Sequence, residues 1–186
     1  METKEREIKG VFEISLKPIE DERGFFMRVF DEKIFEEFGT NRKWVQENHS
    51  KSTQKGIIRG LHFQVPPFAE TKLVRCIKGA VLDVFVDLRK DSDSFGRWGS
   101  IELTENNKKM ILIPRGFAHG FCTLTDDSEV LYKVDNYYSK EHEVGLLWKD
   151  GKLNINWPIS EPILSEKDKS NITFEQFVNK YQGIEV

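Results

Sequence analysis

The residue best suited to chemistry in this sequence is His62, in the strand-like segment 57–64 (IIRGLHFQ). Histidine, with a reference pKa of about 6.5, is a competent base at neutral pH. Alternation along a strand divides the segment into two faces. One face carries Gly60, His62 and Gln64, and the other carries Arg59, Leu61 and Phe63. The His62 face has no bulky apolar side chain, so we expect either a solvated surface or the wall of a polar cavity.

Basic side chains lie near His62 in the sequence, at Arg59, Lys72 and Arg75. A cavity with a histidine and several cations suits an anionic substrate, above all a diphosphate. A single histidine is more often structural than catalytic, and most Lys and Arg side chains are solvated surface charges. The rest of the chain must decide between these readings.

Segment 113–121 (IPRGFAHGF) has the P-x-G-x-x-H spacing of the second cupin motif, a turn that directs His119 inward between two strands. In metal-binding cupins the first motif supplies H-x-H and a downstream glutamate. The matching segment here is His62-Phe63-Gln64, with Gln64 in place of the second histidine. An amide is a poor substitute for imidazole on a transition metal. Glu70 is a weak third ligand, so a metal-free site is favoured over a metal site.

Segment 130–138 (VLYKVDNYY) and the tail add three candidates. Tyr132 is either a core residue or, if it shares a cavity with His62, a general acid whose ionisation a nearby cation would ease. Tyr138, at a strand end, can stack on a flat ring. Asp168 is, from the sequence alone, a surface charge or a helix N-cap.

Short strand patterns separated by turns fill the chain from residue 8 to about residue 148. Strands are predicted at 11–16, 25–30, 44–50, 57–64, 72–77, 80–88, 99–104, 109–114, 119–124 and 130–138, with a turn at 21–24. Helices are predicted at 31–39, with Asp31 as N-cap and Gly39 as its end, and at 173–181. This pattern predicts an all-β antiparallel sandwich or barrel of the jelly-roll kind with a few short peripheral helices, in a single domain over residues 1–186.

The composition excludes several functions. A net charge of −3 gives no global attraction to nucleic acid or an anionic membrane. Cys76 and Cys122 lie far apart in apolar runs, which is typical of buried free thiols in a reducing compartment. The charged N-terminus lacks the apolar core of a signal peptide, and no run reaches transmembrane length, so we expect a cytoplasmic protein.

Taken together, the motifs resemble the dTDP-4-dehydrorhamnose 3,5-epimerase family of nucleotide-sugar epimerases. The resemblance runs through DERGFF, WVQENHSKS, GIIRGLHFQ, IPRGFAHGF, LYKVDNYYS, INWP and LSEKD in order along nearly the whole chain. It implies a cupin-type jelly roll without metal or other cofactor, and a homodimer with exchanged N-terminal strands. It also implies epimerisation at C5, and usually C3, next to the C4 ketone of a nucleotide diphosphate 4-keto-6-deoxy sugar, in deoxysugar biosynthesis for cell-surface polysaccharides.

The same resemblance implies a role for each site residue. His62 is the base, Asp168 orients it, Lys72 stabilises the enolate and Tyr132 returns a proton from the opposite face. The residues placed around the substrate are Arg23, Gln46, Asn48, Arg59, His119, Glu143 and Lys167, with Tyr138 stacking on the base.

Arg28 departs from the family, which usually has an acidic residue there. We expect Arg28 either to influence nucleotide preference or to form an outward ion pair with an acid such as Glu13 or Glu47. Other readings of the chain are an epimerase of one centre, a 3,4-ketoisomerase on another nucleotide sugar, a metal-dependent cupin and a non-catalytic sugar-binding jelly roll.

Overall fold

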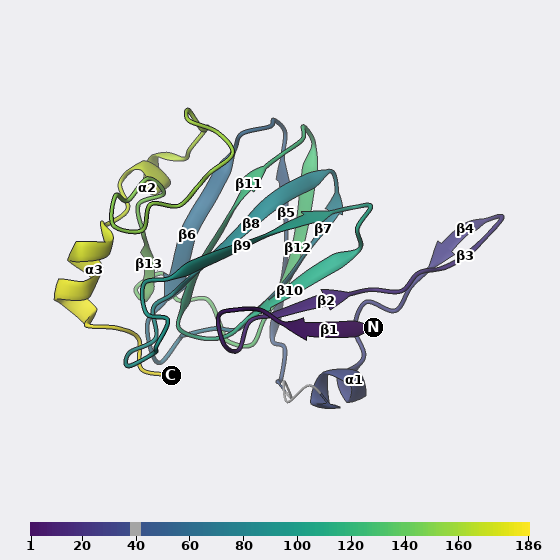
Figure 1. The fold of residues 1–186 in the computed structure, drawn as a ribbon, viewed down its shortest axis with the longest axis horizontal. Coiled ribbons are helices and arrows are strands. Elements are labelled where there is room, and N and C mark those ends of the chain that lie inside the picture. The colour runs from purple at the N-terminus through teal and green to yellow at the C-terminus, as the bar shows by residue number, and fades with distance from the viewer. Residues whose placement is uncertain (38–41) are drawn as a thin grey trace.

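The computed structural model describes residues 1–37 and 42–186, which form two antiparallel sheets and a short hairpin (Figure 1). The six-stranded sheet has the order β1 (Glu2–Glu5), β2 (Phe12–Ser15), β10 (Lys109–Ile113), β7 (Lys72–Lys78), β12 (Ser128–Val134) and β5 (Gln46–Ser52). The five-stranded sheet has the order β13 (Glu143–Gly145), β6 (Ile58–Gln64), β11 (Phe117–Thr123), β8 (Ala80–Asp87) and β9 (Trp98–Thr104). The predicted jelly-roll class is confirmed.

The main core lies between the two sheets. Apolar side chains from both inner faces meet there, including Val74, Phe85, Ile111 and Phe121. Strand β8 has apolar residues on both faces because its outer face is also covered: Val84 belongs to a second cluster on that side. The strand predicted at 80–88 is therefore observed, with both of its faces buried.

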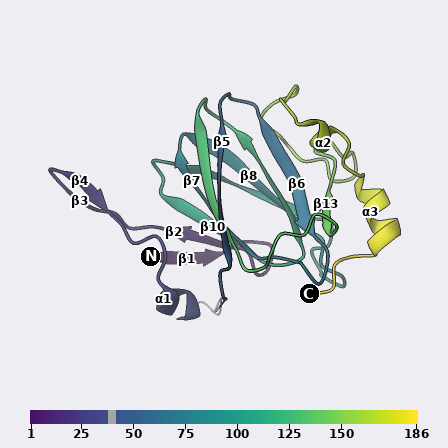
Figure 2. The same cartoon turned by 180° about the vertical axis from the view of Figure 1, so that it is seen from behind.

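The C-terminal helix α3 (Phe174–Tyr181) covers the outer face of the five-stranded sheet. Its N-terminus is fixed by a capping box in which Thr173 and Gln176 exchange hydrogen bonds. Phe177 is fully buried against the sheet, with its ring 5.5 Å from that of Phe63 on β6. Seen from behind, α3 and the short helix α2 (Glu166–Lys169) lie on the same side as β6 and β13 (Figure 2).

Strands β3 (Ile19–Asp21) and β4 (Gly24–Phe26) form an arm that extends away from the sheets (Figure 1). The predicted turn at 21–24 is confirmed. The strand predicted at 25–30 is wrong beyond residue 26, since β4 has only the three residues of β3 to pair with. Phe26 is 66% exposed, so the arm leaves apolar surface uncovered.

The helix predicted at 31–39 is observed as α1 (Glu32–Glu37), which buries Phe35 against the outer face of the six-stranded sheet. Its predicted end, Gly39, lies outside the described residues. The sequence reading missed β1, β3, β13 and α2, which are short and carry little periodic signal. Among the described residues no helix is long and apolar enough to cross a membrane.

Cys76 and Cys122 are buried free thiols, as predicted. Burial raises the pKa of each to about 11, so neither is a reactive thiolate at neutral pH.

Candidate active site

A break in the register of β6 controls which side chains face the interior. His119 on β11 pairs with His62, but Phe121 pairs with Arg59, so β6 carries one extra residue between the two pairs. Gly60 supplies it with a φ of +124°, and a Cβ there would lie 2.6 Å from the Cα of Gly120. The bulge turns Arg59 to the side of His62. The alternation that put Arg59 with Leu61 and Phe63 is therefore wrong at this residue.

Two adjoining chambers open between the sheets. The first chamber, of about 490 Å³, is lined by residues that include Arg59, His119, Ser165 and Asp168. The second chamber, of about 420 Å³, is lined by residues that include Gln46, Asn48, Gln64, Glu70, Tyr138 and Glu143. His62, Lys72 and Tyr132 line both chambers and join them. Of the two expectations for the His62 face, the polar cavity is confirmed.

His62 is held by a buried carboxylate. Its Nε2 lies 2.5 Å from Oδ1 of Asp168, whose other oxygen accepts a hydrogen bond from Ser165 Oγ at 2.9 Å. Burial raises the pKa of Asp168, but the hydrogen bond and charge of His62, with further hydrogen bonds from Ser165 and the Gly60 amide, outweigh it and leave that pKa below its usual value. Asp168 is thus ionised beside the imidazole at neutral pH.

The reading of Asp168 as a surface charge or N-cap is wrong. Asp168 is buried, with 3% of the residue exposed, and the N-cap of α2 is Ser165. Ile163 forms a parallel bridge with Ile57, which brings the segment before α2 alongside β6. This contact spans more than one hundred residues of chain, so local sequence could not predict it.

A second histidine–carboxylate pair lies next to the first. His119, directly opposite His62 in the register, has its Nε2 2.8 Å from Oδ2 of Asp83. Asp83 is fully buried on β8, and within the described part of the chain its Oδ1 has no hydrogen-bond partner. The bond to Asp83 fixes the ring of His119 at the wall of the first chamber. Sequence reasoning missed Asp83, because alternation placed it only on the same face as Phe85.

Lys72 and Tyr132 come from the six-stranded sheet and face His62 across the cavity. The ammonium of Lys72 lies 3.2 Å from Oε1 of Glu70 and 3.5 Å from the carbonyl oxygen of His62. Burial raises the pKa of Tyr132, and the charges of Glu70 and Glu143 raise it further against the opposing charge of Arg59. A nearby cation is expected to ease the ionisation of Tyr132, but burial and the two carboxylates outweigh the effect of Arg59. The phenol is therefore protonated at neutral pH.

The outer part of the second chamber is polar. Tyr138 donates its hydroxyl hydrogen to Glu143 at 2.8 Å, and Glu143 pairs with Lys167 of α2 at 2.6 Å. Burial raises the pKa of Glu143, but Lys167 and Tyr138 more than offset it, so the net pKa is lowered. Gln46 and Asn48 on β5 are joined by a 2.9 Å hydrogen bond.

The chain matches, over residues 5–176, a family model described as dTDP-4-dehydrorhamnose 3,5-epimerase. It is 51% identical over 174 residues to the dTDP-4-dehydrorhamnose 3,5-epimerase of Shigella flexneri, covering 93% of this chain and 94% of that one. The chain belongs to the dTDP-4-dehydrorhamnose 3,5-epimerase family. It is therefore an enzyme of the isomerase class, and the resemblance inferred from the motifs is confirmed.

Solved structures of family members share the fold. The dTDP-4-dehydrorhamnose 3,5-epimerase of Bacillus anthracis, crystallised with TDP and pyrophosphate bound, superposes with a TM-score of 0.91 at 44% identity, covering 93% of this chain and 99% of that one. The dTDP-6-deoxy-D-glucose-3,5-epimerase of Legionella pneumophila, in complex with dTDP-4-keto-L-rhamnose, gives a TM-score of 0.89 at 39% identity, covering 94% and 93%.

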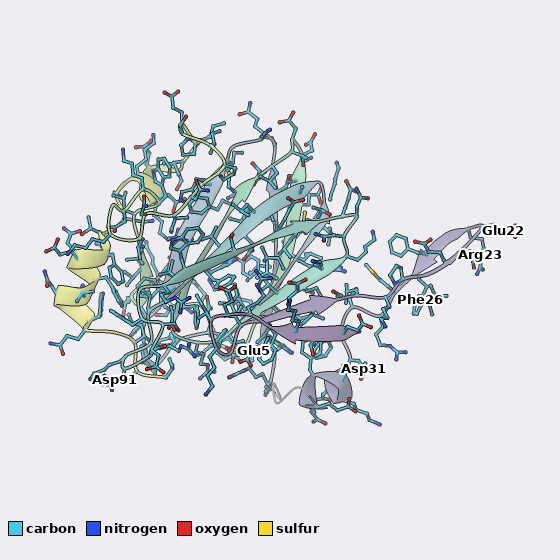
Figure 3. The ribbon with its side chains drawn as sticks, in the orientation of Figure 1. Glu5, Glu22, Arg23, Phe26, Asp31 and Asp91 are labelled. Atoms are coloured by element: carbon cyan, nitrogen blue, oxygen red, sulfur yellow. The ribbon has the colours of Figure 1, made fainter. Side chains whose placement is uncertain are left out.

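Arg23, which the family resemblance places around the substrate, and Arg28, which departs from the family, both lie outside the chambers. Arg23 is at the tip of the arm, where it pairs with Asp21 at 2.5 Å (Figure 3). Arg28 follows β4 and pairs with Asp31 at 3.1 Å, with 63% of its side chain exposed. Within the described residues, neither side chain lines either chamber of its own chain.

The expected ion-pair partners of Arg28 are wrong. Glu13 is already paired with Arg6 and Lys109, and Glu47 is paired with Lys133. Asp31 is nearer in the chain and takes their place.

Gln64, at the position of a cupin metal ligand, is fully committed to other groups. Its amide nitrogen donates to Glu70 at 2.9 Å and to two backbone carbonyls, and its amide oxygen accepts from the Ser139 amide at 2.6 Å. Both oxygens of Glu70 are engaged, by Lys72 and by Gln64. Residues 1–37 and 42–186 contain no group of three or more His, Cys, Asp and Glu side chains arranged to hold a metal ion. These contacts give Gln64 and Glu70 a role other than ligation.

Proposed function

We propose that this protein is a 3,5-epimerase of a dTDP-linked 4-keto-6-deoxy sugar, acting in the cytoplasm in deoxysugar biosynthesis, with residues 1–186 as one catalytic domain. Family membership supports the reaction, and the relative solved with dTDP-4-keto-L-rhamnose supports the substrate class. The observation that carries the proposal is the His62–Asp168 pair on one side of a cavity and Tyr132 on the other, with Lys72 lining the same two chambers.

The first step is removal of a proton from the carbon next to the ketone. The Nε2–H of His62 donates to Asp168, so the lone pair that accepts the carbon-bound proton is on Nδ1. The ring becomes a cation as it takes the proton, and the ionised carboxylate of Asp168 stabilises that cation. Asp168 therefore both orients the ring and offsets its charge.

The electron pair of the broken C–H bond moves into an enolate whose negative charge is on the C4 oxygen. Lys72, held between Glu70 and the His62 carbonyl, is the cation for that oxygen. A preorganised charge aimed at a developing oxyanion is worth far more in a cavity than in water. The ketone itself acidifies its neighbouring carbons, so the proposed reaction needs no metal and no redox cofactor.

Inversion requires the new proton to arrive from the opposite face. Tyr132 lies on β12 of the six-stranded sheet, whereas His62 lies on β6 of the five-stranded sheet. Its raised pKa keeps the hydroxyl protonated, so Tyr132 can donate to the enolate carbon. The phenolate then recovers a proton through solvent from the protonated His62, which returns both groups to their starting state.

We assign the outer residues of the two chambers to the sugar and the nucleotide diphosphate. Arg59 and His119 lie beside His62 in the first chamber. Arg59 can donate to sugar or phosphate oxygens, and the ring nitrogen of His119 that is not bonded to Asp83 can accept from a sugar hydroxyl. Gln46, Asn48, Glu143 and Lys167 supply hydrogen bonds to the remaining polar groups, and the exposed ring of Tyr138 is available to stack on the base.

We also propose that the enzyme is a homodimer with exchanged arms. Phe25 and Phe26 on the arm are 54% and 66% exposed, which is apolar surface that a second subunit would bury. Exchange would bring Arg23 to the partner's chamber, since it cannot serve its own. Sedimentation tests this proposal: a stable and fully active monomer would rule out a shared site.

The experiment that tests the function is incubation of the enzyme with a dTDP-linked 4-keto-6-deoxy hexose in deuterated water, in the presence of a metal chelator. Proton NMR should show loss of the C3 and C5 proton signals and inversion at both carbons, at the same rate with and without chelator. Exchange at neither carbon would refute the epimerase, and exchange abolished by the chelator would refute its metal-free mechanism.

A further inference from the structure

Glu70 lies on the loop between β6 and β7 with its carboxylate in the second chamber. Only 13% of its side chain is exposed. One oxygen lies 3.2 Å from the Lys72 ammonium, and the other accepts a hydrogen bond from the Gln64 amide at 2.9 Å. In the proposed reaction this carboxylate neither takes nor gives a proton.

Gln64 fixes where the Glu70 carboxylate lies. Besides bonding Glu70, its amide nitrogen donates to the carbonyl oxygens of Phe68 at 3.0 Å and Tyr137 at 3.1 Å. Its amide oxygen accepts from the backbone N–H of Ser139 at 2.6 Å. Gln64 is 4% exposed, so these bonds are shielded from water. The Glu70 loop and the segment that carries Tyr138 are thereby tied to β6.

Lys72 depends on this carboxylate for its position. The residue is 8% exposed, and a flexible ammonium that is withdrawn from water takes its position from its ionic partner. Among residues 1–37 and 42–186, its ammonium makes one other hydrogen bond, a long one of 3.5 Å to the His62 carbonyl. Without the charge of Glu70, the lysine would leave this position for solvent or for another acid.

We propose that Glu70 is a positioning residue that holds the Lys72 ammonium where the C4 oxygen of the substrate develops its negative charge. The inference rests on the proposed roles of Lys72 and Tyr132. A carboxylate beside the cation also prevents the lysine from binding the substrate ketone too strongly before charge develops, because the two oxygens compete for it.

Glu70 has a second effect, on Tyr132. The charged and titratable groups that surround the phenol are Glu70 on its loop, Arg59 and His62 on β6, Lys72 on β7, His119 on β11, Tyr138 after β12, Glu143 on β13 and Asp168 on α2. After burial, Glu70 is the largest contribution that raises the Tyr132 pKa. Removing the charge of Glu70 therefore makes the phenol ionise at lower pH.

The test is Glu70→Gln, which keeps the shape of the side chain and removes its charge. We expect kcat to fall about 10- to 100-fold, because Lys72 is displaced from the reacting oxygen. KM should change by less than about threefold, since the nucleotide contacts lie elsewhere. The matched control is Glu185→Gln, which breaks an exposed pair with Lys90 at 2.6 Å outside both chambers and should leave kcat and KM unchanged.

A second readout does not depend on turnover. The chain has four tyrosines, and the ¹³Cζ resonance of Tyr132 can be assigned by its loss in Tyr132→Phe. In Glu70→Gln the Tyr132 resonance should titrate about one pH unit lower than in wild type. Glu70→Asp keeps the charge on a shorter side chain. In this variant the Tyr132 resonance should titrate close to wild type, and kcat should lie between the values of wild type and Glu70→Gln.

The results separate this inference from the function on which it rests. Suppose that wild type exchanges the C3 and C5 protons and that Glu70→Gln matches it in kcat and in the Tyr132 titration. This result would overturn the role of Glu70 and leave the epimerase intact. Equal losses of kcat in Glu70→Gln and Glu70→Asp, with no movement of the titration, would reduce Glu70 to a packing residue and also overturn it. Wild type without exchange would refute the epimerase, while the titration would still test the electrostatic effect.

Discussion

At the scale of single residues, the two chemical groups of the site differ in kind because their surroundings differ. His62 has an ionised carboxylate, Asp168, at 2.5 Å, which offsets the positive charge that the ring acquires when it takes a proton. Tyr132 is half-buried beside Glu70 and Glu143, which favour a neutral phenol. His62 can therefore accept a proton, and Tyr132 remains protonated until it donates its proton to the enolate. An inversion between two faces requires both.

Tyr132→Phe should therefore separate the two halves of the reaction. The variant keeps the base, so proton removal should continue, while return of a proton to the opposite face should fall about 100-fold or more. In deuterated water we expect exchange at C5 to exceed inversion at C5, as followed by NMR. Equal losses of exchange and inversion would show that Tyr132 does not act as the acid of the second step.

At the scale of secondary-structure elements, strand β8 ends in a buried carboxylate that organises the loop after it. Asp87 is fully buried and accepts hydrogen bonds from Arg89 Nη2 at 2.7 Å, Ser92 Oγ at 2.7 Å and Ser94 Oγ at 2.6 Å. Burial raises the pKa of Asp87, but the hydrogen bonds of Arg89, Ser94 and Ser92 outweigh it and the net pKa is lowered. The charge on Asp87 therefore stabilises the folded state.

Asp87→Asn should lower the free energy of unfolding by about 3 kcal/mol at pH 7, because it leaves Arg89 without its buried partner. A folded-state pKa below the unfolded one gives stability that is complete above the unfolded value and is lost as pH falls through the folded value. The difference between wild type and variant should thus shrink below about pH 4. Urea unfolding at several pH values measures it, with the exposed Asp93→Asn as control. A difference that does not vary with pH would contradict the charge-based account.

At the scale of the whole molecule, the alternating pattern was sufficient for the jelly roll and for the polar face of His62. The longer strands of the two sheets, such as β6, β8 and β11, bury at least one face, so the period of their side chains follows the fold. Three features lay beyond that pattern. The bulge at Gly60 changes the face of Arg59, Asp168 reaches His62 through a contact distant in sequence, and Asp83 shows its role only in its pairing with His119.

The arm belongs to the same scale, because the proposed exchange would carry it from its own chain to a partner subunit. Arg28 is at the base of the arm and, in an exchanged dimer, would lie near the partner's nucleotide site. A guanidinium donates hydrogen bonds and cannot accept them, whereas the acidic residue usual in the family accepts them. We expect Arg28→Glu to strengthen binding of dTDP relative to CDP, GDP and UDP, measured by calorimetry on both proteins, with proton exchange on a bound ketone largely unchanged. Identical preferences in the two proteins would show that Arg28 serves only its ion pair with Asp31.

In the proposed reaction His62 removes the carbon-bound proton, and the most direct test is the rate of proton exchange at C3 and C5 in deuterated water for His62→Ala. The control is His49→Ala, since His49 also pairs with a carboxylate, Glu129 at 2.9 Å, but lies outside both chambers. We predict that exchange at both carbons falls by about 1,000-fold or more in His62→Ala while dTDP binding and thermal stability persist, and that His49→Ala exchanges like wild type. Exchange in His62→Ala at the wild-type rate would contradict the mechanism.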